Sequence, residues 1–222
     1  MKTALVIGSS GLVGKQLIFQ LLNNNNYQKV IALTRKDLVL AHPKLVQLIV
    51  DFNNIASIQQ KLLADDVFCC IGTTKSKTPN QEQYTRIDHG IPLEIAQYAK
   101  GNGATQFLLV SAMGANEKSP VFYSRLKAKV ETDLAAIGFD ALQIIRPALL
   151  MGARTEFRLF EKLFQWLFIP LNLLMIGPLK AYKGIAAITV AKAMLNIALQ
   201  KPMGVRVWTN DQLFDQAATN QK

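Results

Sequence analysis

A glycine-rich turn close to the start of the chain restricts its possible folds more than any other feature. Residues Ala4–Gly14, ALVIGSSGLVG, form an apolar run that passes into three glycines spaced three residues apart. In a strand–turn–helix unit, Gly8 would make the tight turn, Gly11 would let the backbone approach a pyrophosphate and Gly14 would let the helix pack on the strand. The turn therefore indicates a nucleotide-binding unit, with a purely structural glycine-rich connection as the alternative.

Apolar runs and amphipathic segments alternate along the rest of the chain. Strands are expected at 4–7, 29–34, 45–52, 66–72 and 106–111, within 139–150 and at 205–208, and helices at 15–22, 55–63, 79–100, 123–137, 185–199 and 212–218. This alternation without a linker predicts an α/β fold with one doubly wound parallel sheet, right-handed crossovers and helices on both faces. Pro92 predicts a kink in the 79–100 helix. We expect a single Rossmann-like domain over residues 1–222, with 152–184 as a small C-terminal substrate-side or interface insertion.

The composition argues against several classes of protein. Cys69 and Cys70 are the only cysteines, and adjacent strand residues point to opposite faces, so neither a disulfide nor a metal site is expected; His42 and His89 stand alone. The net charge of +10 is spread along the chain, which does not favour specific nucleic-acid binding. No signal peptide precedes the first strand, so a cytoplasmic location is expected.

The end of the predicted second strand carries two cations about twenty residues beyond the last glycine of the turn. At this distance a dinucleotide-binding fold places the residue that selects the ribose, where an acidic side chain would bind the 2′-hydroxyl of NAD. Arg35 and Lys36 would instead pair with a 2′-phosphate, Arg35 through its planar fork and Lys36 as a point charge. The expected cofactor is NADP(H), although Asp37 could itself reach a ribose.

The ends of the next two strands are expected to lie along the same cofactor. Asp51 and Phe52 close the third predicted strand at a position suited to bordering the adenine, while Asp51 could equally cap the helix that follows. The fourth strand ends at Gly72, and its end should also approach the cofactor.

A candidate proton-transfer pair follows the fifth predicted strand. Tyr123 and Lys127 lie four residues apart at the head of a predicted helix, so they share one helix face. A nearby ammonium favours the phenolate, and such a tyrosine can give a proton to a carbonyl oxygen or take one from an alcohol. Ser111, at the carboxyl end of the fifth strand, is placed to hydrogen-bond the same oxygen. Without the glycine turn and this serine, the pair would be an ordinary helix face.

These motifs, in this order, resemble the short-chain dehydrogenase/reductase superfamily, and within it the atypical branch that includes the family of the human HIV Tat-interacting oxidoreductase. The matching segments span nearly the whole chain: Gly8–Gly14, Thr34–Lys36, Val50–Phe52, Phe68–Thr74, Tyr123–Lys127, Val130–Glu131 and Arg146–Pro147. The block FCCIGTT at 68–74 is the most specific, because nothing in the generic fold demands two cysteines there.

The resemblance implies an NADP(H)-binding Rossmann domain with a catalytic pair, Tyr123 and Lys127. It places Ser10, Gly11, Leu12 and Val13 at the pyrophosphate, Arg35 and Lys36 at the 2′-phosphate, Ile71 and Gly72 near the ribose, Pro147 beside the nicotinamide and Arg158 as a further contact. The chain departs from the family in carrying Asp88 where many extended relatives have asparagine, and in having few hydroxyls after Ser111. Both departures bear on the proton relay.

The aromatic segment 157–177 has the least defined role in the chain. It is expected to be core, an oligomer interface or, as an alternative, the wall of a site for a substrate with an apolar body. The leading hypothesis is an NADPH-dependent reductase of a ketone or aldehyde, acting on a small-molecule carbonyl or alcohol. The main alternative is an NADP(H)-binding regulator that contacts a protein partner or a second copy through 157–177. A third is association with a membrane surface.

Overall fold

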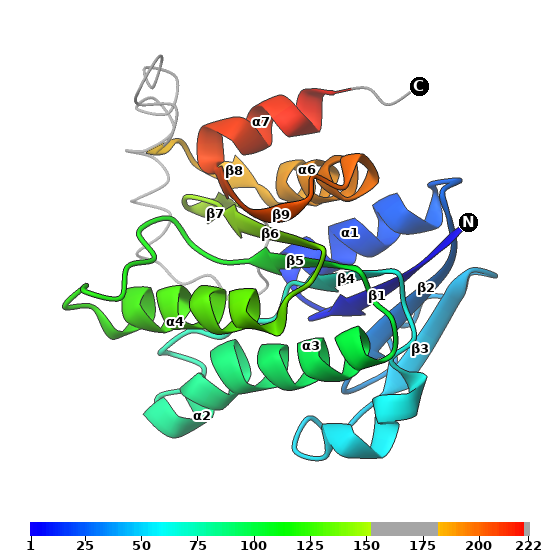
Figure 1. The fold of residues 1–222 in the computed structure, drawn as a ribbon, viewed down its shortest axis with the longest axis horizontal. Coiled ribbons are helices and arrows are strands. Elements are labelled where there is room, and N and C mark those ends of the chain that lie inside the picture. Colours follow the sequence, from blue (N-terminus) through cyan, green and yellow to red (C-terminus); the bar gives the residue numbers. More distant parts are fainter. Residues whose placement is uncertain (152–181, 220–222) are drawn as a thin grey trace.

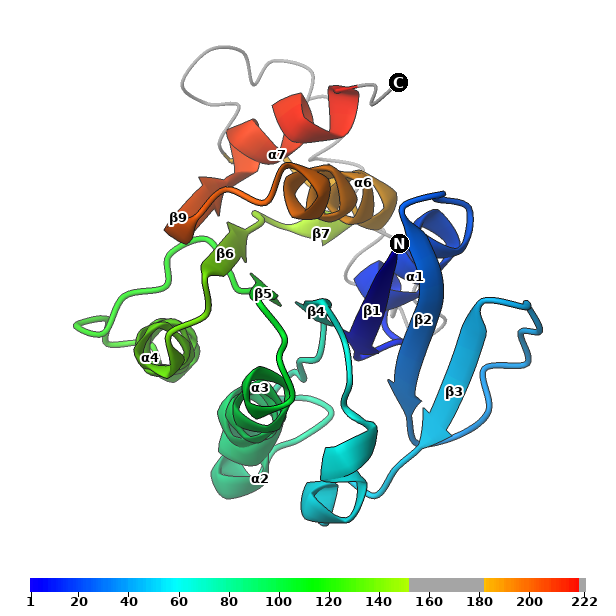
Figure 2. The ribbon, with the colours of Figure 1, turned by 45° about the vertical axis from the view of Figure 1, so that its right-hand side comes forward.

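The computed structural model describes residues 1–151 and 182–219, and its centre is a seven-stranded parallel sheet. The strands lie in the order β3-β2-β1-β4-β5-β6-β9, so the chain first builds outward from β1 in one direction and then in the other (Figures 1 and 2). Their bounds are β1 Lys2–Ile7, β2 Tyr27–Thr34, β3 Leu45–Ile49, β4 Asp66–Cys69, β5 Gln106–Val110, β6 Ala141–Arg146 and β9 Gly204–Thr209. This arrangement confirms the predicted doubly wound fold.

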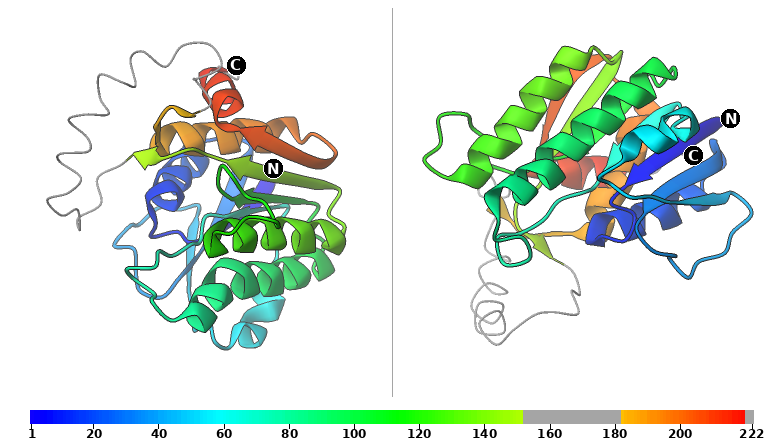
Figure 3. Two further views of the ribbon diagram at one scale, coloured as in Figure 1. Left: turned by 90° about the vertical axis from the view of Figure 1, so that its left-hand side faces the viewer. Right: turned by 90° about the horizontal axis from the view of Figure 1, so that it is seen from below.

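Helices cover both faces of the sheet because its central strands are apolar on both faces. In β1, Ala4 and Val6 pack on one side and Leu5 and Ile7 on the other, all four fully buried. The first side is covered by α1 Leu12–Leu22, α6 Ala187–Gln200 and α7 Asn210–Ala218; the second by η1 Ile55–Lys61, α3 Ile91–Gly101 and α4 Phe122–Ile137. The helices α3 and α4 lie side by side (Figure 3).

Two strands end earlier than predicted. β3 stops at Ile49 instead of residue 52, and β4 stops at Cys69 instead of Gly72. At the end of β4 the chain packs closely on the glycine turn, since a Cβ on Gly8 would lie only 2.6 Å from the backbone of Cys70. The two cysteines do face opposite sides of the sheet, as predicted, and both are free thiols.

The predicted kinked helix at 79–100 is present as three consecutive helical segments. These are α2 Gln81–Thr85, the π-helical segment η2 Arg86–Gly90 and α3. The irregularity precedes Pro92 by one turn because proline lacks the N–H that would bond to the carbonyl of Asp88, four residues earlier. The N–H of Ile91 accordingly bonds to the carbonyl of Arg86, five residues back.

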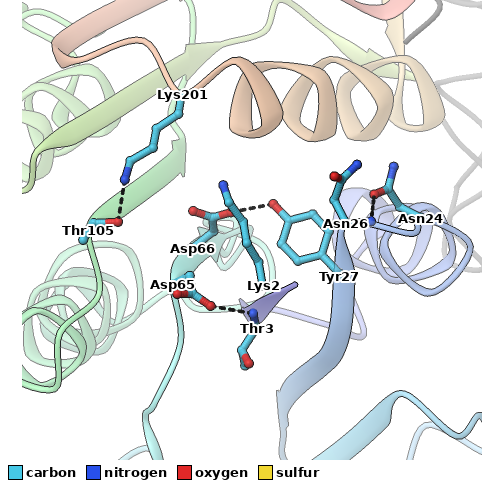
Figure 4. A network of polar contacts seen from close by, with 9 residues as sticks. All are labelled: Lys2, Thr3, Asn24, Asn26, Tyr27, Asp65, Asp66, Thr105 and Lys201. Atoms are coloured by element: carbon cyan, nitrogen blue, oxygen red, sulfur yellow. Dashed lines mark hydrogen bonds and ion pairs between the residues drawn. The ribbon is translucent and has the colours of Figure 1, made fainter. Parts of the chain in front are cut away.

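A buried polar network joins the amino ends of the strands, at the edge opposite the glycine turn (Figure 4). Tyr27 at the start of β2 donates its hydroxyl hydrogen to Asp66 at the start of β4, at 2.6 Å. The ammonium of Lys2 lies 3.0 Å from the same carboxylate oxygen. Asp66 and Tyr27 are fully buried, so the bond between them joins groups that water cannot reach, whereas Lys2 is partly exposed.

Some predictions fall where the structure gives no description. Arg158 and the aromatic segment 157–177 lie outside the described residues, and their roles stay predictions. Beside this stretch, β7 Leu150–Met151 pairs in parallel with β8 Ile185–Ala186. Among the described helices, none combines the length and apolar character needed to cross a membrane.

Candidate functional site

The glycine turn is built as tightly as its spacing predicts. Gly8 has a φ of +78°, which side-chain-bearing residues rarely adopt, and its carbonyl accepts the N–H of Gly11 at 2.9 Å. A Cβ on Gly14 would lie 2.2 Å from the carbonyl oxygen of Gly8. The first turn of α1 therefore rests directly on the βα turn, which fits the role predicted for Gly14.

Within the described chain, the helix that follows the turn begins with N–H groups that no side chain caps. Gly11 is the N-cap of α1 and no side chain caps it among the described residues, while the first turn contains no acidic residue. The N–H groups at a helix start have no acceptor within the helix, and the helix dipole makes this end attractive to anions. Leu12 and Val13 lie in this turn, beside Ser10 and Gly11. The geometry suits a pyrophosphate, as the glycine spacing predicts.

Two cavities with a shared wall lie at the carboxyl ends of the strands. The first, of about 1140 Å³, is lined among others by Gly8, Arg35, Asp51 and Phe52. The second, of about 640 Å³, is lined by Leu12, Val13, Ser111, Tyr123 and Lys127. Both are bordered by Ser10, Gly11, Ile71 and Gly72. We call the two together the cleft. Gly14 and Lys36 are not among its lining residues, and neither is the buried Pro147.

The two cations after β2 are exposed at the first cavity, which we call the wide end of the cleft; the second cavity is its narrow end. Arg35 lines the first cavity, and Lys36 is its exposed neighbour. The carboxylate of Asp37, the competing ribose ligand, accepts the N–H of Val39 at 2.7 Å and a weaker bond from Gln47 at 3.4 Å. Asp37 is thus engaged in its own loop, while Arg35 faces the cavity.

The end of the third strand also shapes the wide part of the cleft. Asp51 and Phe52 both line it, but the carboxylate of Asp51 accepts the N–H of Asn53 at 2.9 Å. The carboxylate is thus engaged in a short turn. It does not cap the following helix, as the alternative prediction had it, because Asn54 is the N-cap of η1. The carbonyl of Phe52 accepts a hydrogen bond from Arg86 at 2.8 Å.

The predicted proton-transfer pair lies at the narrow end of the cleft. Tyr123 and Lys127 sit in the first two turns of α4, with the Lys127 Nζ atom 5.8 Å from the centre of the Tyr123 ring. Tyr123 is 38% exposed, whereas Lys127 is only 4% exposed. The tyrosine is therefore accessible to a ligand, and the lysine is buried beneath its ring.

A buried acid accompanies this lysine, at the position where the sequence departs from the family it resembles. Asp88, in η2, holds an oxygen 3.0 Å from the Lys127 Nζ atom. Burial disfavours the charge of Lys127, but Asp88 and Tyr123 outweigh it and hold the pKa of Lys127 above its ordinary value. The sequence signal was the resemblance itself, which implies an asparagine at this position in many extended relatives.

Ser111 is bound to a second buried acid. Its hydroxyl contacts the carboxylate of Glu131, which also receives two bonds from Arg146, at 3.0 Å and 2.5 Å. Those bonds raise the pKa of Arg146 above its ordinary value. Because a carboxylate held by a guanidinium can only accept, Ser111 must donate its hydrogen to Glu131. Toward the cleft, Ser111 presents lone pairs.

No cluster of His, Cys, Asp and Glu suited to a metal ion occurs in the ranges 1–151 and 182–219. His89 instead bonds to Asp133 at 2.6 Å, and this bond, together with Lys129, lowers the pKa of Asp133. Burial raises the pKa of the Cys69 thiol to about 12, so this thiol is a poor metal ligand.

Comparison with known proteins gives one family. The model of the NAD(P)H-binding family matches residues 8–160. Protein HTATIP2 of Rattus norvegicus is 33% identical over 199 residues, which make up 88% of this chain and 80% of the rat protein. Protein FMP52, mitochondrial, of Candida albicans is 35% identical over 156 residues, or 68% of each chain.

Solved structures agree on the fold. MoeE5 in complex with UDP-glucose and NAD matches with a TM-score of 0.69 at 15% identity, over 97% of this chain and 81% of that one. The oxidoreductase ylbE from Lactococcus lactis matches with a TM-score of 0.66 at 15% identity, over 92% and 89%. At these identities the likeness concerns the fold alone.

Proposed function

This chain belongs to the NAD(P)H-binding family and to the group that includes rat HTATIP2, and we propose that it is an NADP(H)-dependent oxidoreductase that reduces a ketone or aldehyde. The observation that carries the proposal is the position of Tyr123 and Lys127. They line the same cavity as the first turn of α1, so the proton-transfer pair and the predicted pyrophosphate site open onto one space.

The residues of the cleft fit a dinucleotide with a 2′-phosphate. The N–H groups at the start of α1 would bind the pyrophosphate, and Gly11 would let the backbone approach it. Cβ atoms on Gly8 or Gly11 would meet neighbouring backbone, so the turn needs glycine at both positions to close this tightly. Ile71 and Gly72 would border the ribose. Arg35 and Lys36 would bind the 2′-phosphate, which favours NADP(H) over NAD(H).

The bound cofactor would supply the hydride that reduces the substrate carbonyl. Tyr123 would give its phenolic proton to the carbonyl oxygen, and the ammonium of Lys127 would stabilise the phenolate that remains. Ser111 would not donate to that oxygen, because its hydrogen is held by Glu131. It would accept a hydrogen bond from the hydroxyl of the product alcohol. Tyr123 is therefore the only proton donor that we assign to the reaction.

The narrow end of the cleft suits a substrate with an apolar body. Besides Tyr123, its wall includes Val110, Leu150, Met151 and Ile188, and the last two are 43% and 44% exposed. Exposed apolar side chains in a cavity favour an apolar ligand.

Two measurements test the proposal. NADPH binding is followed by fluorescence titration, and turnover is followed by NADPH absorbance across a panel of ketones and aldehydes. With any substrate so found, Tyr123→Phe should lower kcat by about 10²- to 10⁴-fold with NADPH affinity unchanged. Tyr98→Phe, in α3 and outside the lining of the cleft, is the matched control.

Full turnover by Tyr123→Phe would refute the proton-transfer role. Tight NADPH binding with no turnover on any panel member would favour the alternative function, an NADP(H)-binding regulatory or protein-interaction module.

A further inference from the structure

The ion pair between Asp88 and Lys127 is the most deeply buried pair of opposite charges that the described residues place in the cleft. The Asp88 side chain is 1% exposed and that of Lys127 is 5% exposed. The two carboxylate oxygens of Asp88 have different partners: Oδ1 lies 3.0 Å from the Lys127 Nζ atom, and Oδ2 accepts the N–H of Thr73 at 2.8 Å. One side chain therefore joins α4 to the loop after β4.

The position of Asp88 follows from the irregular helix that carries it. It is the central residue of η2, the π-helical segment that Pro92 accompanies, and η2 packs against α4. π-Helical turns change the face on which a side chain emerges and frequently occur at functional sites. Here Asp88 lies under the loop that begins at Gly72. A Cβ added to Gly72 would stand 3.3 Å from the Oδ1 atom of Asp88 and 3.8 Å from the Nζ atom of Lys127.

The site favours a carboxylate at this position. Oδ2 of Asp88 accepts the N–H of Thr73, and Oδ1, which has no hydrogen-bond donor among the described residues, faces the ammonium of Lys127 as its counter-charge. An amide of the same shape carries one oxygen and one NH₂ group, and would leave either the N–H of Thr73 or the ammonium of Lys127 facing another donor. A buried ammonium without its counter-ion would tend to lose its proton.

Among the described residues, three groups bear on the charge of Lys127. Asp88 faces it from η2, Tyr123 from its own helix and Cys69 from the end of β4. Asp88 is the only carboxylate among them.

We propose that Asp88 is a positioning residue: it keeps Lys127 protonated beneath Tyr123 and ties that lysine to the Thr73 loop on the cofactor side of the cleft. The catalytic meaning of this coupling rests on the proposed function, but the coupling itself does not. Thr73 lines both cavities, and its carbonyl accepts the hydroxyl of Tyr84 at 3.1 Å, so this loop is held from two sides. A change at Asp88 would thus reach Lys127 and the loop together.

The test follows the protonation of Lys127 without substrate or cofactor, so its result is independent of turnover. The protein is produced with isotope-labelled lysine, and the Lys127 side-chain NMR signal is assigned with Lys127→Arg and followed with pH. In Asp88→Asn, Lys127 should lose its proton about one pH unit or more below the wild-type value. Asp140→Asn, which removes the partner of Lys100 at the surface, is the matched control and should leave the Lys127 signal unchanged. An unaltered Lys127 titration in Asp88→Asn would overturn the proposal.

A second measurement covers the case in which Asp88→Asn does not fold. Melting temperatures are compared for the wild type, Asp88→Asn, Lys127→Met and the double variant, with an unfolded single variant assigned the lower limit of the scan. Because each single change strands one buried partner, the double variant should melt higher than Asp88→Asn alone. A double variant that melts lower than Asp88→Asn would contradict the coupling.

Discussion

Replacement of Tyr27 by phenylalanine removes one hydroxyl from the buried network at the amino ends of the strands (Figure 4). The hydroxyl donates to Asp66 at 2.6 Å, and both residues are fully buried, so water cannot replace the lost bond. Asp66 keeps the Lys2 ammonium at 3.0 Å and therefore stays paired. The change thus removes one hydrogen bond to a charged group and leaves the packing of the ring in place.

The expected loss at neutral pH is about 1.5–3 kcal/mol of unfolding free energy, the usual value of a hydrogen bond to a charged group. In a protein of this size, this corresponds to a fall in melting temperature of about 3–12 °C.

The loss should also depend on pH in a definite direction. Burial, followed by the charge of Asp66, raises the pKa of Tyr27 far above its ordinary value. In the unfolded chain the phenol ionises near its ordinary pKa of about 10. The stability that Tyr27 contributes is therefore fully present below about pH 10 and is lost as the pH rises, at about 1.4 kcal/mol per unit, until the folded-state pKa is reached. The difference between wild type and Tyr27→Phe should vanish about one to two pH units above pH 10.

Denaturant unfolding of both proteins at neutral pH and at several values above about pH 10 measures this difference. Tyr182→Phe is the control, since Tyr182 is 61% exposed and should show neither the loss nor its pH dependence. Equal stability of Tyr27→Phe and wild type at neutral pH would refute the reasoning. So would a difference that stays constant through the alkaline range.

Two further changes probe the cleft directly. Gly14→Ala would place a Cβ 2.2 Å from the carbonyl oxygen of Gly8 and so displace the turn. NADPH binding, followed by fluorescence titration, should weaken by about tenfold or more. Unchanged affinity would show that the turn is not the pyrophosphate site. Ser111→Ala should lower the melting temperature, because Glu131 loses a buried donor, yet reduce kcat by about tenfold or less. A loss of kcat as large as that of Tyr123→Phe would show that Ser111 acts on the substrate oxygen itself.

The parts of this fold that depend on local pattern could be predicted from the sequence. Short apolar runs bounded by turn residues predict β1 and β5 closely, and the four-residue spacing of Tyr123 and Lys127 predicts their shared helix face. The strand ends were less predictable. The apolar character of β4 continues through Ile71, so the sequence pattern does not show that the strand ends at Cys69, where the chain packs on the turn at Gly8.

The acids of the cleft could not be predicted in the same way. Asp88 reaches Lys127 across 39 positions of sequence, and Ser111 meets Glu131 across 20. Such pairings depend on how η2, α4 and β5 pack together, and hydrophobic periodicity carries no information on them. Sequence reasoning therefore placed Tyr123 and Lys127 on one helix face and noted Asp88, but it did not pair Asp88 with Lys127 or Glu131 with Ser111.

The preference between the two dinucleotides tests the central claim most directly. Wild-type protein is titrated with NADPH and NADH, and the same titrations are run on Arg35→Ala. The wild type should bind NADPH at least tenfold more tightly than NADH. Arg35→Ala should lose about 10- to 150-fold in NADPH affinity, which corresponds to about 1.5–3 kcal/mol for a charge-assisted hydrogen bond. Its NADH affinity should be unchanged. Equal binding of NADPH and NADH by the wild type, or an Arg35→Ala variant that keeps its NADPH affinity, would contradict the account.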